Sequence, residues 1–233
     1  SFAEETARQY QFTREAQDEY AINSLNRAKR ATETGAFAKE IVPVTVTDRK
    51  GSVTVDKDEQ PLKADPAKIP TLKPAFAKDG TITAANASSI SDGAAALVMT
   101  RESVARRLGM KIVARVAGHA AHAHEPGLFT TAPVPAIRKA LKRAGWSVDD
   151  VDLFEVNEAF AVVAMIAERE LGLDREKLNV NGGACALGHP IGASGARILA
   201  TLLAALEARG GKRGVASLCI GGGEATAMAV ELA

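Results

Sequence analysis

The residue with the clearest chemical potential is a single histidine, His189. It lies within residues 179–197, among closely spaced glycines and directly before a helix expected to begin at Pro190. Glycines permit positive φ and let backbone approach a ligand. A helix N-terminus favours the neutral imidazole, which can accept a proton. The stretch predicts a general base, although a glycine-rich turn with an uninvolved histidine fits the spacing equally well.

Two other stretches carry candidate groups. Cys219 ends an expected strand and precedes three glycines, 221–223, so we expect a reachable thiol beside free N–H groups. That suits an acid/base thiol next to an oxyanion hole, whereas a lone free cysteine is more often a small buried residue. Asn157 lies at a strand-to-helix junction, where it could cap the helix or contact a ligand.

The remaining histidines favour no metal centre. His119, His122 and His124 fit neither a helical i, i+4 pair nor a zinc-finger spacing. No cysteine or acidic cluster accompanies them. We therefore expect no metal, and a metal-binding module is the most distant alternative.

Composition excludes several classes of protein. The 233 residues are 46% hydrophobic and 24% charged, as in an ordinary globular protein, with a net charge of +1. That balance supplies no broad basic face for nucleic acid. The sequence has no apolar run long enough for a bilayer and opens without a signal segment. The two cysteines, Cys185 and Cys219, indicate free thiols in a reducing compartment, so we expect a cytoplasmic protein.

The elements that must position these residues alternate between strands and helices. After a helix over 13–34, a β-hairpin formed by 41–47 and 52–56 and a proline-rich excursion over 57–80, strands are expected over 94–100, 111–123, 153–156, 215–220 and 225–232, with a short extended piece over 178–181. Between them, helices are expected over 101–108, 135–144, 158–171 and 190–209. This order predicts a layered α/β fold with a mostly parallel sheet whose last two strands are antiparallel.

Four stretches, in this order along the chain, resemble signatures of the thiolase family. They are Asn86–Ala95, Val156-Asn-Glu-Ala-Phe160, Asn179–Arg197 with its Gly-His-Pro-Ile-Gly core, and Ser217–Glu224 with Cys-Ile-Gly-Gly-Gly. The resemblance covers essentially the whole chain. It implies that residues 81–233 form the C-terminal thiolase-fold domain, a layered α-β-α core. Residues 1–80 would be the C-terminal part of the family's inserted loop domain.

The resemblance also implies catalytic roles. His189 would activate the nucleophilic thiol and help to bind the thioester oxygen. Cys219 would exchange a proton with the acetyl methyl group. Asn157 would hold a water that, with His189, forms one oxyanion hole, and the N–H of Gly221 would contribute to a second.

Binding partners follow from the same resemblance. Ser88, Ala159 and Phe160 would line the pantetheine channel of coenzyme A, which is a substrate, so no separate cofactor is implied. Acyl-CoA thioesters, the N-terminal half of the thiolase and further copies in a homodimer or homotetramer are the expected partners. Nucleic acid and membranes are not.

Two departures from the family pattern limit this interpretation. Thiolases form an acyl-enzyme on a cysteine of the N-terminal half, and neither Cys185 nor Cys219 lies in that motif. We therefore expect a C-terminal portion that is competent only with the N-terminal half. Residues 128–133 replace the Met-Gly-x-Gly-Pro element usual in biosynthetic thiolases. Acetoacetyl-CoA or a short 3-ketoacyl-CoA is the first choice of substrate. The alternatives are a longer-chain 3-ketoacyl-CoA thiolase and a non-catalytic acyl-CoA-binding or assembly module.

Overall fold

A four-stranded mixed sheet organises the chain in the computed structural model, which describes residues 2–233. Its strand order is β3 (Ala114–Ala123), β6 (Glu224–Leu232), β5 (Arg213–Ile220) and β4 (Leu153–Val156). β4 runs parallel to β5, whereas β6 is antiparallel to both β5 and β3. The prediction of a mostly parallel sheet is therefore wrong, and that of an antiparallel last pair is confirmed. A three-residue turn joins β5 to β6, and so short a connection allows only antiparallel pairing.

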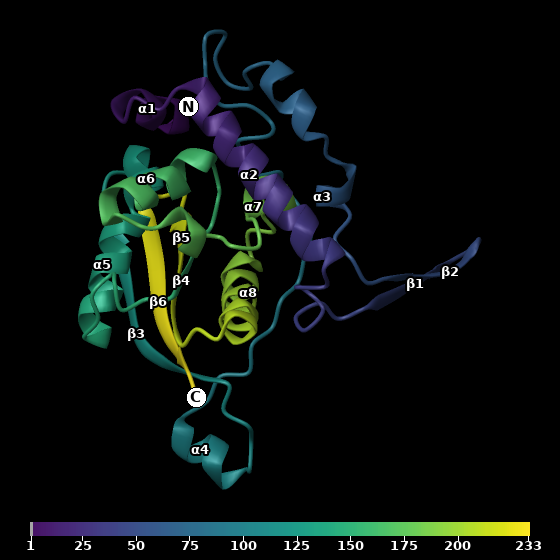
Figure 1. Cartoon of the computed structure of the whole chain (residues 1–233), viewed down its shortest axis with the longest axis vertical. Coiled ribbons are helices and arrows are strands. Elements are labelled where there is room, and N and C mark those ends of the chain that lie inside the picture. The colour runs from purple at the N-terminus through teal and green to yellow at the C-terminus, as the bar shows by residue number, and fades with distance from the viewer. Residues whose placement is uncertain (1) are drawn as a thin grey trace.

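Helices cover both faces of this sheet (Figure 1). One face carries α5 (Pro133–Ala144), which Gly145 ends in a left-handed conformation, and α6 (Ala161–Leu171). The opposite face carries α8 (Ser194–Arg209). The layered α-β-α core expected from the sequence is confirmed. The helices 135–144 and 158–171 are also confirmed, with shifted first residues.

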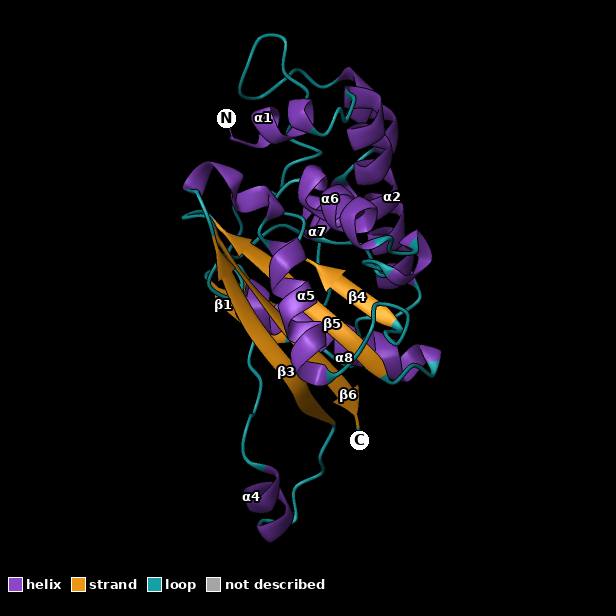
Figure 2. Ribbon diagram, turned by 90° about the vertical axis from the view of Figure 1, so that its left-hand side faces the viewer, coloured by secondary structure: helices purple, strands orange, loops and turns teal. Residues whose placement is uncertain are grey.

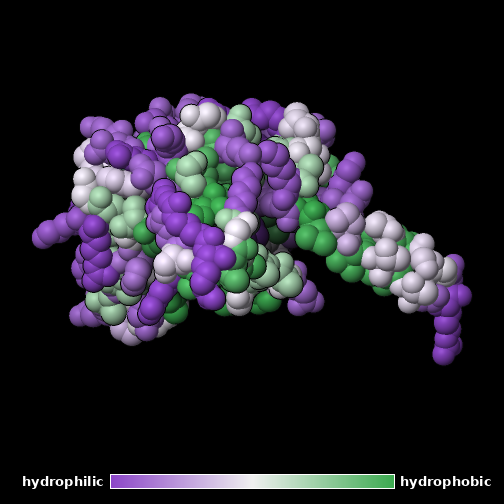
Figure 3. Space-filling view, turned by 90° about the horizontal axis from the view of Figure 1, so that it is seen from below, coloured by the Kyte–Doolittle hydropathy of each residue, from purple (hydrophilic) through white to green (hydrophobic). Residues whose placement is uncertain are grey.

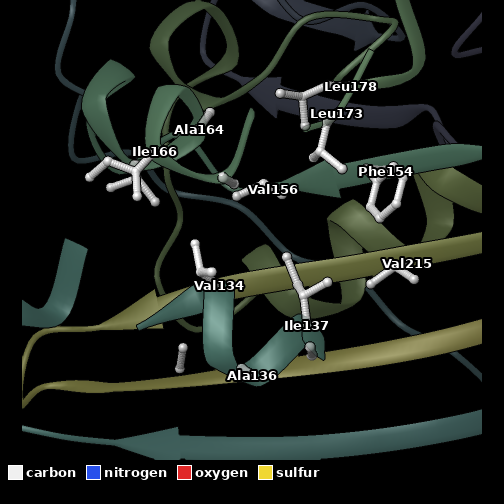
Figure 4. Close-up of a cluster of buried hydrophobic side chains, with 14 of the residues drawn as sticks. Val134, Ala136, Ile137, Phe154, Val156, Ala164, Ile166, Leu173, Leu178 and Val215 are labelled. Atoms are coloured by element: carbon white, nitrogen blue, oxygen red, sulfur yellow. The ribbon is translucent and has the colours of Figure 1, made fainter. Parts of the chain in front are cut away.

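The main core lies between the sheet and the α5/α6 layer (Figure 4). Its largest fully buried side chains include Phe154, Ile137 and Ile166. Small residues bring the layers close together. A Cβ on Gly118 of β3 would lie 2.7 Å from the carbonyl oxygen of Ala140 in α5, so only glycine fits there. This packing accounts for a chain with few aromatic residues.

The helices within residues 2–80 cover the end of the sheet where β4 and β5 finish (Figure 2). They are α1 (Phe2–Gln9), α2 (Arg14–Glu33), α3 (Gln60–Lys63) and the 3₁₀ turn η1 (Pro66–Thr71). Thr13 caps α2, because its hydroxyl accepts the N–H of Ala16 at 3.2 Å. The helix predicted over 13–34 is confirmed, and α2 packs against α6 and the short α7 (Ala184–Leu187).

The expected β-hairpin is confirmed as β1 (Val44–Asp48) and β2 (Gly51–Val55). It projects from the body of the molecule and ends in a hydrophilic tip (Figure 3). Cross-strand valine pairs occupy one side of the ribbon, and threonine and serine pairs occupy the other. Every residue of both strands is exposed, so the hairpin adds nothing to the core.

One expected strand is absent. Residues 94–100 have no regular secondary structure and pair with no strand among residues 2–233, and most of them are exposed. An apolar sequence pattern shows that a segment is suited to a sheet, but it does not show that another strand is available to pair with it. The short helix that follows is confirmed as α4 (Glu102–Arg107). The short extended piece expected over 178–181 makes an isolated parallel bridge from Leu178 to Phe154 of β4. No helix within residues 2–233 is both long and apolar enough to cross a membrane.

Candidate functional site

The carboxyl ends of β4 and β5 lie side by side and carry two of the candidate residues. Because the strands are parallel, both end at the same edge of the sheet. The N–H of Asn157, one residue beyond β4, donates to the carbonyl of Ser217 at 2.9 Å. Cys219 lies two residues further along β5. The sheet itself therefore brings Asn157 and Cys219 to one edge.

His189 joins this edge from a separate loop. Its N–H donates to the carbonyl of Ser89 at 3.0 Å, which ties the histidine loop to residues 87–90. Nε2 of His189 lies 3.4 Å from Nδ2 of Asn157. Two candidate residues 32 positions apart in the sequence thus face each other at hydrogen-bonding distance.

Ser194 determines which nitrogen of His189 is free. Its hydroxyl lies 2.6 Å from Nδ1 of His189 and donates to the carbonyl of Pro190 at 3.1 Å. Since the hydroxyl has one proton, it accepts from Nδ1–H, which leaves Nε2 unprotonated and facing Asn157. Ser194 is fully buried. It was missed in the sequence because serine is common at helix starts, so its position alone carries no functional signal.

The helix after His189 begins at Ser194, not at Pro190 as expected. Residues 191–193 form a turn, so the N-terminus of α8 lies further along the chain than the prediction required. Burial is the larger cause that lowers the pKa of His189 below its ordinary value, and the charge of Arg197 adds to it. The lowered pKa favours the neutral imidazole that the sequence predicts, but its main cause is burial and not the N-terminus of a helix.

The glycines before His189 make room for protein, not for a ligand. A Cβ on Gly182 would collide with the backbone of α2 at Ser24, and one on Gly183 would collide with the carboxylate of Glu158. Gly182 also has φ +78°. Both glycines are therefore required by close packing under α2.

Asn157 does not cap the following helix. The N-cap of α6 is Phe160, and no side chain caps it. Asn157 is almost completely buried, and its Oδ1 has no hydrogen-bond partner within the described chain. Buried polar atoms are normally paired, so an unpaired one at a sheet edge indicates contact with a ligand or an ordered water.

Cys219 is less accessible than predicted. Its exposed fraction is 7%, and it packs in the main apolar cluster. Burial raises the pKa of its thiol to about 12, so the thiol is protonated at neutral pH. The adjoining Gly221 is exposed, with open space where a side chain would stand.

The three residues expected to line a channel lie together. Both the N–H and the hydroxyl of Ser88 donate to the carbonyl of Ala159 at 3.0 Å, and Ala87 bridges to Phe160. Phe160 contacts two aromatic rings that the sequence did not single out. These are Phe76 at 6.2 Å and Phe129 at 6.3 Å between ring centroids. All three predicted residues are half-buried.

The histidines on and after β3 make other contacts. Nδ1 of His122 lies 2.9 Å from Nζ of Lys139, and Nε2 of His124 lies 2.7 Å from the carbonyl of Leu128. His119 is exposed. Within residues 2–233 no group of three or more potential ligands is arranged to hold a metal ion.

Comparison with known proteins gives consistent matches. A family model for the thiolase N-terminal domain matches residues 1–103, and one for the thiolase C-terminal domain matches residues 110–232. These models do not test our division at residue 80, which stays a prediction. Acetyl-CoA acetyltransferase 1 of Arabidopsis thaliana is 54% identical over 97% of this chain and 55% of its own length. The cytosolic acetyl-CoA acetyltransferase of Mus musculus is 51% identical over 98% of this chain and 58% of its own length.

Solved structures agree with these matches. The acetyl-CoA acetyltransferase of Bacillus anthracis superposes with a TM-score of 0.96 and 46% identity, over 100% of this chain and 59% of its own. Acat5 thiolase from Ascaris suum, in complex with coenzyme A, superposes with a TM-score of 0.90 and 42% identity. This match also covers 100% of our chain and 59% of the other chain. The chain thus spans less than two thirds of the length of these relatives. The fold is thiolase-like, and the chain belongs to the thiolase family.

Proposed function

We propose that this chain supplies the acid/base and oxyanion-binding part of a thiolase. The reaction is the reversible condensation and thiolysis of acetoacetyl-CoA or a short 3-ketoacyl-CoA with coenzyme A. One observation carries the proposal. The unprotonated Nε2 of His189 faces Nδ2 of Asn157 at 3.4 Å, at the sheet edge that also holds Cys219.

His189 acts as the base in this scheme. Its lowered pKa keeps the imidazole neutral at pH 7, and Ser194 directs the free electron pair of Nε2 toward Asn157. A neutral Nε2 takes the proton of a thiol, which becomes the attacking thiolate. Once protonated, Nε2–H joins Asn157 in binding the thioester oxygen, either directly or through a water held by Asn157.

Cys219 exchanges a proton with the acetyl carbon of the substrate. A thiol with a pKa of about 12 is a proton donor in the free chain. During thiolysis it gives its proton to the acetyl carbanion released when the C–C bond breaks. This donation leaves a thiolate. Condensation is the reverse step, in which the thiolate of Cys219 takes a proton from the acetyl methyl group. The exposed N–H of Gly221 provides the second oxyanion contact, where charge develops on the enolate oxygen.

Coenzyme A and the remaining part of the protein complete the proposal. Ser88, Ala159 and Phe160 line the pantetheine channel. The structure of Acat5 thiolase from Ascaris suum in complex with coenzyme A supports a coenzyme A ligand for this fold. The acyl-accepting cysteine is supplied by the N-terminal half. Relatives named acetyl-CoA acetyltransferase support a short acyl chain. We further propose a location in the cytoplasm, which the name of the cytosolic mouse relative supports. A homodimer or homotetramer stays a proposal that rests on the family resemblance alone.

The test is turnover of acetoacetyl-CoA by a protein that joins this chain to the N-terminal half. Cys219→Ser and His189→Asn should each lower kcat by about 10²–10⁴-fold, the usual contribution of acid–base catalysis. Thermal unfolding of each variant should stay close to that of the parent. Turnover within a factor of two of the parent would refute the assigned roles.

A further inference from the structure

A fully buried carboxylate, Glu158, joins three segments beneath the candidate site. Its Oε1 accepts from the hydroxyl of Tyr20 at 3.0 Å and from Nδ2 of Asn179 at 3.1 Å. Its Oε2 accepts from the hydroxyl of Ser24 at 2.8 Å and from the N–H of Cys185 at 3.0 Å. Two donors belong to α2. The other two, Asn179 before α7 and Cys185 within α7, lie in the segment that leads to His189. The residue before Glu158 in the chain is Asn157.

Asn179 extends this network to the end of β4. Its Oδ1 accepts the N–H of Val156 and its Nδ2 donates to the carbonyl of Val156, both at 2.8 Å. Gly183 also donates its N–H to Ser24 at 2.9 Å. The strand end that carries Asn157 and the loop that carries His189 are therefore tied to one carboxylate.

A second contact holds α2 to the same loop independently of Glu158. Nη1 of Arg27 donates to the carbonyls of Arg175 and Leu178, at 3.0 Å and 2.7 Å. Its Nη2 pairs with Glu176 at 2.7 Å. Because of this contact, α2 remains attached when the donors to Glu158 are changed, so the effect of Glu158 on the site can be tested separately.

We infer that Glu158 is a positioning residue that sets the separation of Asn157 and His189 by tying both to α2. A buried carboxylate is a costly way to hold a fold together, because a well-packed apolar residue of similar volume is often neutral or more stabilising. Four directional hydrogen bonds, however, fix the relative positions of three segments, which apolar packing does less sharply. The inference deepens the proposed function but rests on it only where turnover is measured.

The first test needs no activity and uses this 233-residue chain. In Glu158→Gln one acceptor oxygen remains, so either the Tyr20 and Asn179 pair or the Ser24 and Cys185 pair loses its acceptor. The loosened loop admits water to His189. Since burial is the larger cause of its lowered pKa, the pKa measured by NMR titration should rise toward 6.5. An unchanged pKa would overturn the inference.

A matched control separates positioning from stability. Ile137→Val removes a methylene from a fully buried side chain of α5, in the main core cluster that also holds Tyr20 but outside the network. It should lower the stability while leaving the pKa of His189 unchanged. If Glu158→Gln does not fold, the double variant Tyr20→Phe/Ser24→Ala cuts the ties to α2 and keeps the carboxylate. It should raise the pKa of His189 in the same direction, and no change would again overturn the inference.

Turnover then connects the network to catalysis. In the protein joined to its N-terminal half, Glu158→Gln should lower kcat by about 10–100-fold, as expected for a misplaced catalytic group, with a smaller change in KM. If Glu158→Gln and the control Ile137→Val change kcat and KM by the same factors, the effect arises from lost stability alone, and this result contradicts the inference. If instead His189→Asn leaves turnover intact while the pKa of His189 responds to Glu158→Gln, the proposed function fails and the positioning role stands.

Discussion

The ends of β4 and β5 lie next to each other at one sheet edge, yet they are built in opposite ways. Beyond β4, Asn157 and Glu158 stand in a polar network that reaches α2 and the histidine loop. At the end of β5, Cys219 is surrounded by apolar side chains and followed by an exposed glycine turn. Hydrogen bonds fix the end of β4. Apolar packing holds the end of β5, and the turn that follows it begins with an exposed glycine.

Under the proposed function, this difference separates two requirements of acyl transfer. Oxyanion binding needs donors at fixed positions, and directional hydrogen bonds provide that. Proton exchange with carbon needs a group whose pKa is adjusted by its surroundings, and burial provides that for a thiol. The following predictions test whether the two ends depend on these different forces.

The largest effect concerns the thiol at the end of β5. With a pKa of about 12 in place of 9.0, the thiolate fraction of Cys219 at pH 8 falls about thousandfold, since each pH unit is a factor of ten. Alkylation by iodoacetamide, followed by peptide mass spectrometry, should be slower by about that factor than for a free cysteine peptide. A rate within tenfold of the peptide would mean that the β5 end is open and its thiol unburied.

The next effect concerns the polar network at the end of β4. Asn179→Ala removes both side-chain hydrogen bonds to the backbone of Val156 and one donor to Glu158. All three of these hydrogen bonds are buried. It also leaves alanine at φ +47°. The free energy of unfolding measured with urea should fall by about 2–4 kcal/mol. A loss below about 1 kcal/mol would show that packing, not hydrogen bonding, holds this end.

Local sequence signals predicted the groups at both ends but not their environments. His189 and Cys219 could be predicted because the signals that mark them, namely glycines, a strand end and a helix start, come from residues adjacent to them in the sequence. Cys219 was expected to be reachable, because a strand followed by glycines says nothing of the side chains that cover it. Its burial comes from helices far away in the sequence.

Long-range partners explain what sequence reasoning could not reach. Tyr20 lies 138 residues from Glu158, and a hydrogen bond of that span leaves no periodicity to detect. The strand expected over 94–100 was wrong for a related reason, because its apolar pattern says nothing about whether residues 2–233 provide a strand to pair with it. The layered core was predictable because alternating helices and strands have few ways to pack.

A pH dependence should also arise at β4. Burial raises the pKa of Glu155 to about 8, against an ordinary 4.5, with Arg197 at 4.0 Å only partly opposing it. The folded state therefore binds this proton more tightly than the unfolded state. Its contribution is full below pH 4.5 and is lost as the pH rises through 8, with a slope of about 1 kcal/mol per pH unit. Urea unfolding between pH 5 and 9 measures the slope.

Glu155→Gln provides the control for this pH dependence. The amide cannot ionise, so the slope between pH 4.5 and 8 should flatten relative to the parent chain, while other carboxylates contribute equally to both. Parallel curves for the two proteins would mean that Glu155 is ionised in the fold and paired with Arg197.

The smallest effect makes the comparison between the two strands quantitative. Ser217 of β5 is fully buried, but its hydroxyl makes only one hydrogen bond, to the carbonyl of Thr226 at 2.8 Å. The bond from Asn157 to Ser217 uses backbone atoms and survives substitution. Ser217→Ala should therefore lower the free energy of unfolding by only about 1 kcal/mol. If it costs as much as Asn179→Ala, polar contacts stabilise β5 as strongly as β4, and the distinction between a hydrogen-bonded end and a packed end is wrong.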